Sequence, residues 1–300
     1  MTPFMIRVPG STANLGPGFD SLGLAVNRYL TLNVQSAATW HFNYVQSEYT
    51  ELPSDENNLI YKVLDYTIQY LGIAKKEFAC EVEVECELPL ARGLGSSAAA
   101  VVAGIELANC LYHLNLSNEM KARIGSLYEG HPDNIGASLY GGLTIGTHSQ
   151  DDTFIVPWGP LPLDLLIVVP KVQLLTSVSR GQLPAHLGYS QAVQASSFAN
   201  VLVAALIKGD LKLAGEMMNK DLFHHPYREK LVPQLEEVRR FFDNQANCGI
   251  ALSGAGPSVM VFLEEGRAAT IRPSLLQRFP DCEIDCLRPV ATGVEVIEKL

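Results

Sequence analysis

The chain has 300 residues, of which 47% are hydrophobic and 18% are charged, a composition typical of folded globular proteins and unlike that of disordered or repeat proteins. Its formal net charge of −10 at pH 7 argues against a binding surface for nucleic acid or for an anionic membrane, because a negative field repels both. A single hydrophobic core rarely serves so many residues, so the length favours two domains.

The first half of the sequence predicts strands and helices interrupted by glycine-rich loops. Alternating side chains predict strands, apolar residues three or four positions apart predict helices, and clusters of glycine and proline predict loops. In chain order we expect a strand over residues 6–9, a structured loop over 9–20, a strand over 22–34, a helix over 57–71, a strand over 78–88, a loop over 89–97, helices over 98–111 and 117–130, and a strand over 143–146.

The second half continues with mixed elements. Three prolines and a glycine within residues 157–162 mark the best candidate for a domain boundary. Beyond it we expect a strand over 163–169, helices over 191–207, 211–222 and 231–242, and strands over 249–252 and 259–263 joined by a tight loop over 253–258. Strands and helices do not alternate strictly, so we predict two α+β domains, 1–157 and 158–300, rather than a doubly wound sheet.

The six cysteines form no C-x-x-C pair and no metal-like spacing with histidine, so we expect reduced thiols. Cys80 and Cys86 alternate in phase with valines while glutamates occupy the other face, which predicts a half-buried strand whose cysteines act as small apolar side chains. Residues 1–8 contain no secretory signal, and no run reaches the ~20 apolar residues of a membrane span. We therefore expect a cytoplasmic protein with no membrane partner.

The strongest chemical signal is the segment 89–97, where glycines and serines lie between a predicted strand and a predicted helix. A polyphosphate needs several converging backbone N–H donors, which glycines allow by close approach and which a helix N-terminus supplies together with its dipole. The segment lacks the lysine of the common P-loop, so Mg²⁺ and backbone dipoles would have to offset the phosphate charge, with the Ser97 hydroxyl as a reasonable metal contact. The alternative is a glycine loop that only permits tight packing of strand on helix.

Three sequence blocks, in this order and spacing, resemble the signature motifs of the GHMP kinases. They are P-G-S-T-A-N-L-G-P-G-F-D-S-L-G-L-A over 9–25, P-L-A-R-G-L-G-S-S-A-A-A over 89–100 and L-S-G-A-G-P-S-V over 252–259. The stretch T-A-N-L-G-P-G-F-D, with E-G-H-P-D-N over 129–134 and H-P-Y-R over 225–228, looks like the homoserine kinase branch. The resemblance covers essentially the whole chain. It implies an N-terminal domain like domain 2 of ribosomal protein S5, a C-terminal ferredoxin-like domain and an active site between them.

The resemblance also implies an activity, transfer of the ATP γ-phosphoryl group to the hydroxyl of L-homoserine with the help of Mg²⁺, in a homodimer. ATP would bind at Pro89, Leu90, Ala91, Arg92, Gly93, Leu94, Gly95, Ser96, Ser97, Ala98 and Ala99, and Mg²⁺ at Ser97 and Glu129. For the amino acid, the implied residues are Asn14 and Asp20 at the ammonium, Arg180 and Arg228 at the carboxylate with Thr176 nearby, Gly254 in the same site, and His131 and Asn134 beside the reacting hydroxyl.

These residue types suit an amino-acid alcohol. An ammonium needs an anion or an amide oxygen, and a carboxylate suits a guanidinium fork. Each assignment nevertheless has a plain alternative: Asp20 could be a turn acid, Arg180 a solvated charge in a loop, and His131 a cap at a helix end.

The residue at position 134 bears on the mechanism. Mevalonate-kinase-like members place an aspartate there, whereas Asn134 cannot act as a base. A loose phosphoryl-transfer transition state needs little early proton removal, so positioning and charge stabilisation can carry catalysis, and we predict no side-chain general base. Two other functions stay open: a kinase for mevalonate, shikimate or a related alcohol, and a non-catalytic metabolite sensor built on the same fold.

Overall fold

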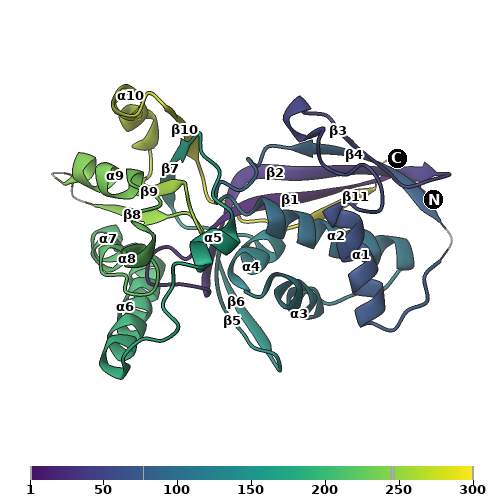
Figure 1. Ribbon diagram of the computed structural model, residues 1–300, viewed down its shortest axis with the longest axis horizontal. Coiled ribbons are helices and arrows are strands. Elements are labelled where there is room, and N and C mark those ends of the chain that lie inside the picture. The colour runs from purple at the N-terminus through teal and green to yellow at the C-terminus, as the bar shows by residue number, and fades with distance from the viewer. Residues whose placement is uncertain (1, 77, 244, 246, 299–300) are drawn as a thin grey trace.

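Two β-sheets organise the chain (Figure 1). The computed structural model describes residues 2–76, 78–243, 245 and 247–298. The strands are β1 (Phe4–Ala13), β2 (Leu22–Ala37), β3 (His41–Tyr44), β4 (Ala79–Cys86), β5 (Leu143–His148), β6 (Thr153–Gly159), β7 (Leu163–Pro170), β8 (Cys248–Leu252), β9 (Val259–Glu264), β10 (Cys282–Leu287) and β11 (Glu295–Glu298). The helices are α1 (Leu59–Tyr70), α2 (Ser96–Tyr112), α3 (Asn118–Glu129), α4 (Asp133–Tyr140), α5 (Thr176–Arg180), α6 (Tyr189–Lys208), α7 (Leu211–Asn219), α8 (His225–Arg228), α9 (Gln234–Phe242) and α10 (Ala268–Arg278).

The first sheet has the strand order β11-β1-β2-β4-β3, and β5 and β6 extend it from β2. Helices α1 to α4 lie along this part of the molecule (Figure 1), and α2 is buried along most of its length. On β4 the cysteines and valines are buried and the glutamates are exposed, as the alternation predicted. All six cysteines are free thiols.

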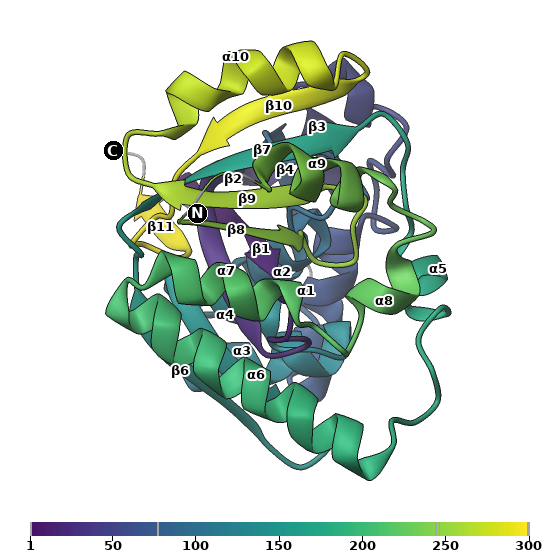
Figure 2. The same ribbon diagram turned by 90° about the vertical axis from the view of Figure 1, so that its left-hand side faces the viewer.

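The second sheet has the antiparallel order β10-β7-β9-β8, drawn side by side in Figure 2. Helices connect β7 to β8 and β9 to β10, which is the β-α-β-β-α-β connection of a ferredoxin-like fold. Strand β7 is buried on both faces. Its residues Leu165 and Ile167 join the core shared with the first sheet, whereas Leu166 and Val168 pack with α9 and α10. The predicted α+β class is confirmed.

One predicted loop is wrong in its first part. Residues 9–13 continue strand β1 and pair with β2, and the loop begins only at Asn14. The pairing register shifts between Pro9 and Gly10, and such a bulge accepts both residue types within a strand. A Cβ atom on Gly10 would lie 2.3 Å from Leu88, so the glycine also permits close packing.

Several elements give little signal in the sequence. Helix α4 has only 8 residues and includes Gly136, β6 contains Pro157 and exposes most of its side chains, and α10 contains Pro273. Helix α3, in contrast, begins as predicted, because the Ser117 side chain accepts a hydrogen bond from the Met120 N–H and so caps the first turn.

The division of the chain at residues 157 and 158 stays a prediction. Strand β6 pairs with β5 up to Gly159, and the second sheet begins with β7 at Leu163. Strand β11 returns to the first sheet beside β1, where Glu298 pairs with Phe4 (Figure 1).

Helix α6 is, within the described residues, the one helix long and apolar enough to cross a membrane, with a mean hydropathy of 1.3 in its most apolar window. A single helix that meets this test is weak evidence for a membrane span, because helices packed in protein interiors often have the same composition.

Candidate active site

A cavity of about 630 Å³ gathers side chains from all five sequence blocks. The predicted site residues that line it are Asn14, Asp20, Leu90, Ala91, Gly93, Gly95, Ser96, Ser97, Ala98, Glu129, His131, Asn134, Thr176, Arg180, Arg228 and Gly254. Four residues of the predicted ATP-binding run, Pro89, Arg92, Leu94 and Ala99, lie outside this lining, and Leu94 and Ala99 are buried in the core.

The glycine-rich loop brings the N-terminus of α2 to the cavity. Gly93 and Gly95 have φ angles of +81° and +69°, a backbone region that favours glycine. A Cβ atom would lie 2.2 Å from the Ser253 carbonyl oxygen at Gly93 and 2.4 Å from Ser11 Oγ at Gly95. Tight packing therefore does explain these glycines, and it also places the first turn of α2, with its unpaired N–H groups and positive dipole end, at the cavity wall.

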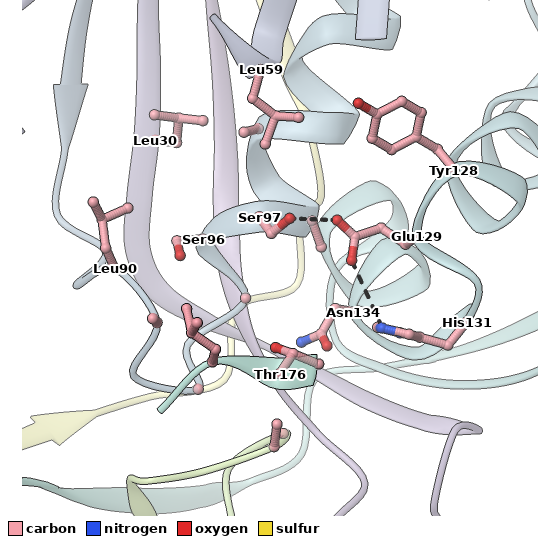
Figure 3. A pocket seen from close by; sticks show the side chains of 18 of the residues that line it. Leu30, Leu59, Leu90, Ser96, Ser97, Tyr128, Glu129, His131, Asn134 and Thr176 are labelled. Atoms are coloured by element: carbon pink, nitrogen blue, oxygen red, sulfur yellow. Dashed lines mark hydrogen bonds and ion pairs between the residues drawn. The ribbon is translucent and has the colours of Figure 1, made fainter. Parts of the chain in front are cut away.

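A chain of polar side chains crosses the cavity wall next to this turn (Figure 3). Ser97 Oγ lies 2.5 Å from one oxygen of Glu129, and the other Glu129 oxygen lies 3.8 Å from His131 Nε2. The second ring nitrogen of His131 is 2.7 Å from Asp133 Oδ1. Burial alone would lower the pKa of His131, but the carboxylates of Asp133 and Glu129 together raise that pKa above its ordinary value.

Asn134 is held with its amide facing a fixed partner. It lies in the first turn of α4, is 8% exposed, and its Nδ2 atom donates to Ser11 Oγ at 2.9 Å. Since Ser11 is part of β1, the first sheet fixes the amide orientation, and the oxygen of the amide points away from that bond. In the view of Figure 3 the Asn134 amide is drawn between His131 and Thr176, and all three residues line the cavity.

Two arginines line the same cavity in different environments. Arg180, at the end of α5, forms a two-point ion pair with Asp20 at 2.6 and 3.0 Å. Arg228, in α8, is 1% exposed, and within the described residues its hydrogen-bond acceptors are the His224 ring at 3.1 Å and the Gly254 carbonyl at 3.4 Å. Burial and the nearby charge of Arg180 lower the pKa of Arg228 to about 10, so the side chain is still a cation at neutral pH.

The loop that follows β1 is held in a left-handed conformation by its own side chains. Asn14 and Asp20 have φ angles of 73° and 51°, which asparagine and aspartate tolerate better than most residues. Asn14 Nδ2 donates to the Gly254 carbonyl at 2.8 Å, and Asn14 Oδ1 accepts from the Asp20 N–H at 3.0 Å. These bonds connect the first and third motifs, so Asp20 stands at a defined place in the cavity.

The sequence analysis missed the apolar half of the cavity. This side is lined by Leu30, Tyr44, Tyr49, Leu52, Pro53, Leu59 and Ile60, and Figure 3 shows Leu30, Leu59 and Leu90 together on it. The residues come from separate elements, and each has the pattern of an ordinary core side chain, so no local signal marks them. Phe19, which also lines the cavity, was within a motif but received no role.

Family models match both halves of the chain. Residues 58–142 match the GHMP kinases N terminal domain, and residues 202–281 match the GHMP kinases C terminal domain. The expected two-domain GHMP kinase fold is confirmed.

Comparisons with individual proteins show to which branch of the GHMP kinases the chain belongs. The chain is 51% identical over 295 residues to a homoserine kinase of Halalkalibacterium halodurans, covering 98% of this chain and 95% of that one. Among solved structures, a putative homoserine kinase from Listeria monocytogenes superimposes with a TM-score of 0.84 at 39% identity, covering 99% of this chain and 100% of that one. A homoserine kinase from Cytophaga hutchinsonii gives a TM-score of 0.82 at 29% identity, with 99% and 98% coverage. The chain belongs to the homoserine kinase family of GHMP kinases.

Proposed function

We propose that the protein transfers the γ-phosphoryl group of ATP to the hydroxyl of L-homoserine, giving O-phospho-L-homoserine on the route to threonine. One observation carries this proposal: the same cavity holds a helix N-terminus suited to phosphate and a set of charges suited to an amino acid. A neutral sugar would not use the buried guanidinium of Arg228, which pairs with no carboxylate among the described residues. Mevalonate and shikimate carry a carboxylate but no ammonium, so they would not use the anionic Asp20 in the same way.

The cavity offers one region suited to the phosphates of ATP and another suited to its adenine ring. The phosphates would lie at the first turn of α2, where Ser96, Ser97 and Ala98 line the cavity and the N–H groups and dipole favour anions. The adenine ring suits the apolar half, which offers hydrophobic and aromatic surface around Tyr44 and Leu59.

The residues present also fit Mg²⁺. Ser97 and Glu129 offer a hydroxyl and a carboxylate 2.5 Å apart at the phosphate end of the cavity, and magnesium in phosphoryl-transfer sites takes one or two protein oxygens together with substrate phosphates. When bound, the ion would neutralise charge on the phosphate oxygens. Asp133 is a weaker candidate for a ligand, because its Oδ1 atom is already bonded to His131 and to the Asn134 N–H.

The amino-acid end of the cavity would bind both charged groups of L-homoserine. The carboxylate would lie against Arg228, which is buried and has no ion pair with a carboxylate among the described residues, and against Arg180. The ammonium would approach Asp20 and the carbonyl and amide oxygens around Asn14 and Gly254. The buried guanidinium of Arg228 would gain a charge-assisted hydrogen bond when the substrate carboxylate binds. That bond would offset the desolvation cost of burying the guanidinium without an anion.

The phosphoryl transfer itself would depend on positioning. Asn134 and His131 would orient the hydroxyl, and Thr176 lines the same part of the cavity. No general base is assigned, because an amide at position 134 cannot accept a proton and a loose transition state requires little early proton removal. Asp133, although adjacent, is engaged by His131 at 2.7 Å.

The remaining expectations are also proposals. We place the enzyme in the cytoplasm, with no nucleic-acid or membrane partner, as the charge of −10 favours.

We expect a homodimer. Phe154, Val156 and Trp158 on β6 are 62%, 62% and 53% exposed, and exposed apolar patches of this kind commonly mark subunit contacts. Light scattering should give a mass near twice the chain mass of 32.7 kDa.

A coupled assay of ADP release tests the proposed function. The purified protein would be given ATP and Mg²⁺ with L-homoserine, mevalonate, shikimate or galactose. We expect release with L-homoserine and formation of its O-phosphate, seen by phosphorus NMR. Preferred turnover of another alcohol would replace the proposal with a related kinase, and no turnover of any would favour the sensor.

A further inference from the structure

His224 lies fully buried between the loop that follows β1 and the short helix α8. Its Nε2 atom is 3.0 Å from the Gly16 carbonyl oxygen, and its Nδ1 atom is 3.1 Å from Nη1 of Arg228. A carbonyl oxygen can only accept a hydrogen bond and a guanidinium can only donate one. The ring is therefore the Nε2–H tautomer, and its Nδ1 lone pair receives the bond from Arg228.

This arrangement requires a neutral ring. Burial lowers the pKa of His224 to about 4, with the charge of Arg228 acting in the same direction and that of Asp221 opposing it. At neutral pH the lone pair is thus available. A protonated ring would lose the acceptor and would face Arg228 with a like charge.

Phe19 adds a second contact between the same two elements. Its ring is stacked with that of His224, with centroids 5.2 Å apart and planes inclined by 26°. The guanidinium carbons of Arg228 and Arg180 lie 5.4 and 5.6 Å from the centre of the Phe19 ring, within the range of cation–π attraction. Phe19 directly precedes Asp20, so His224 contacts both the loop that carries Asp20 and the arginine of α8.

We propose that His224 is a positioning residue that holds the guanidinium of Arg228 and the loop around Asp20 at the separation required by the carboxylate and ammonium of the substrate. The inference rests on the proposed function, since it takes Arg228 as the carboxylate-binding group. Arg228 has few other contacts that set its orientation. Among the described residues its Nε atom has no hydrogen-bond partner, and its Nη1 atom reaches the Gly254 carbonyl only at 3.4 Å.

Three substitutions of His224 distinguish the two hydrogen bonds that its ring makes, one with Arg228 and one with the Gly16 carbonyl. His224→Asn can present an amide oxygen near the position of Nδ1, His224→Gln can present an amide N–H near the position of Nε2, and His224→Ala supplies neither. We expect His224→Ala to raise KM for L-homoserine by about tenfold or more, the effect of losing one hydrogen bond to a charged group, while KM for ATP is unchanged. His224→Asn should recover more of the affinity than His224→Gln.

His225 provides a matched control, because it is the same residue type, adjacent and 2% exposed, but its ring contacts Arg239 at 3.0 Å and the Leu252 N–H at 3.1 Å. His225→Gln should lower the melting temperature without raising KM for L-homoserine. In a protein that already carries Arg228→Leu, His224→Ala should raise that KM by less than it does in the otherwise wild-type protein, and the remaining rise would come from the loop around Asp20. Melting temperatures would be recorded for every variant.

The outcomes distinguish the two proposals. Failure of the wild-type protein to phosphorylate L-homoserine would refute the proposed function itself. Normal wild-type turnover with an unchanged KM in His224→Ala would refute only the positioning role. An equal rise in KM for His225→Gln, or a full effect of His224→Ala in the Arg228→Leu background, would also refute the positioning role, because the effect would then be one of general stability.

Discussion

Arg180 and Asp20 form a two-point ion pair across the cavity, with N–O distances of 2.6 and 3.0 Å. The pair joins α5 to the loop that follows β1, 160 residues apart in the chain. Each partner is also a predicted binding group for the opposite charge of the substrate. An amino acid presents the same two charges as the pair does, so it can exchange with the pair without leaving either residue uncompensated.

Loss of the Asp20 charge should affect binding more than stability. We expect Asp20→Asn to lower kcat/KM for L-homoserine by about tenfold or more, because it removes the anion at the ammonium. The melting temperature should change little, since both side chains are about one third exposed, at 36% and 32%, and such pairs contribute only ~0–1 kcal/mol. Asp285→Asn, which breaks a comparable pair with Arg28 at 3.0 Å, is the control and should leave both quantities unchanged.

Removal of the Arg228 charge should impair the use of L-homoserine without weakening the binding of ATP. We expect Arg228→Leu to reduce kcat/KM for L-homoserine by about a hundredfold, the usual consequence of losing a buried charge-assisted contact, with KM for ATP preserved. Steady-state kinetics with each substrate varied in turn would measure this. An unchanged kcat/KM for L-homoserine would exclude Arg228 as the carboxylate group.

Substitutions of Asn134 test whether the phosphoryl transfer proceeds without a side-chain general base. Asn134→Ala should lower kcat by about tenfold to a hundredfold, because the hydroxyl loses an orienting partner. Asn134→Asp should not increase kcat, since the proposed mechanism lacks no base. A large gain in Asn134→Asp, measured under saturating substrates, would overturn that mechanism.

Glu129 should determine the magnesium requirement. We expect Glu129→Gln to raise the Mg²⁺ concentration for half-maximal activity by about tenfold, because a neutral amide is a poorer ligand than a carboxylate. Glu119, in the first turn of the same helix α3, gives the control variant Glu119→Gln, for which we expect the wild-type requirement. Equal magnesium titrations for wild type and Glu129→Gln would remove Glu129 from the metal site.

The buried His224 should make folding sensitive to acid. Its pKa of about 4 in the folded protein lies below the ~6.5 of an unfolded histidine, so the unfolded chain takes up the proton first. The stability that the neutral His224 contributes to the folded protein is fully present above about pH 6.5 and is lost as the pH falls toward 4. By pH 4.5 this loss lowers the free energy of unfolding by about 2 kcal/mol. Urea unfolding at pH 7 and 4.5 should show a smaller decrease for His224→Gln. Identical decreases in both proteins would contradict the assigned neutral state.

Local patterns predicted the elements whose side chains repeat regularly. The alternation on β4, the apolar spacing of α1 and the cap at Ser117 each lie within a few neighbouring residues. The strand over residues 9–13 was missed because its glycine and proline are accommodated by a bulge and by packing against Leu88. Those contacts involve residues far away in the sequence, so no local pattern reports them.

The site was predictable to the extent that its residues lie in motifs. Asp20, Arg180 and Arg228 meet in one cavity as expected, although their binding roles stay predictions. No local pattern predicts that Asp20 pairs with Arg180, because that contact depends on how the two halves of the chain pack. The bond between His224 and Arg228 depends on how the ring and the guanidinium are buried at α8, which the sequence pattern does not report. The apolar wall around Leu30 and Leu59 is a property of the assembled fold in the same way.

The comparison that most directly tests substrate recognition uses L-homoserine with one charged group removed at a time. 3-Aminopropan-1-ol lacks the carboxylate and 4-hydroxybutyrate lacks the ammonium, while both keep a terminal hydroxyl. Measured by ADP release, kcat/KM should fall by about a hundredfold or more for each relative to L-homoserine, and Arg228→Leu should lose most of its preference for L-homoserine over 3-aminopropan-1-ol. Equal use of all three alcohols by the wild-type protein would contradict recognition of the amino acid through Asp20, Arg180 and Arg228.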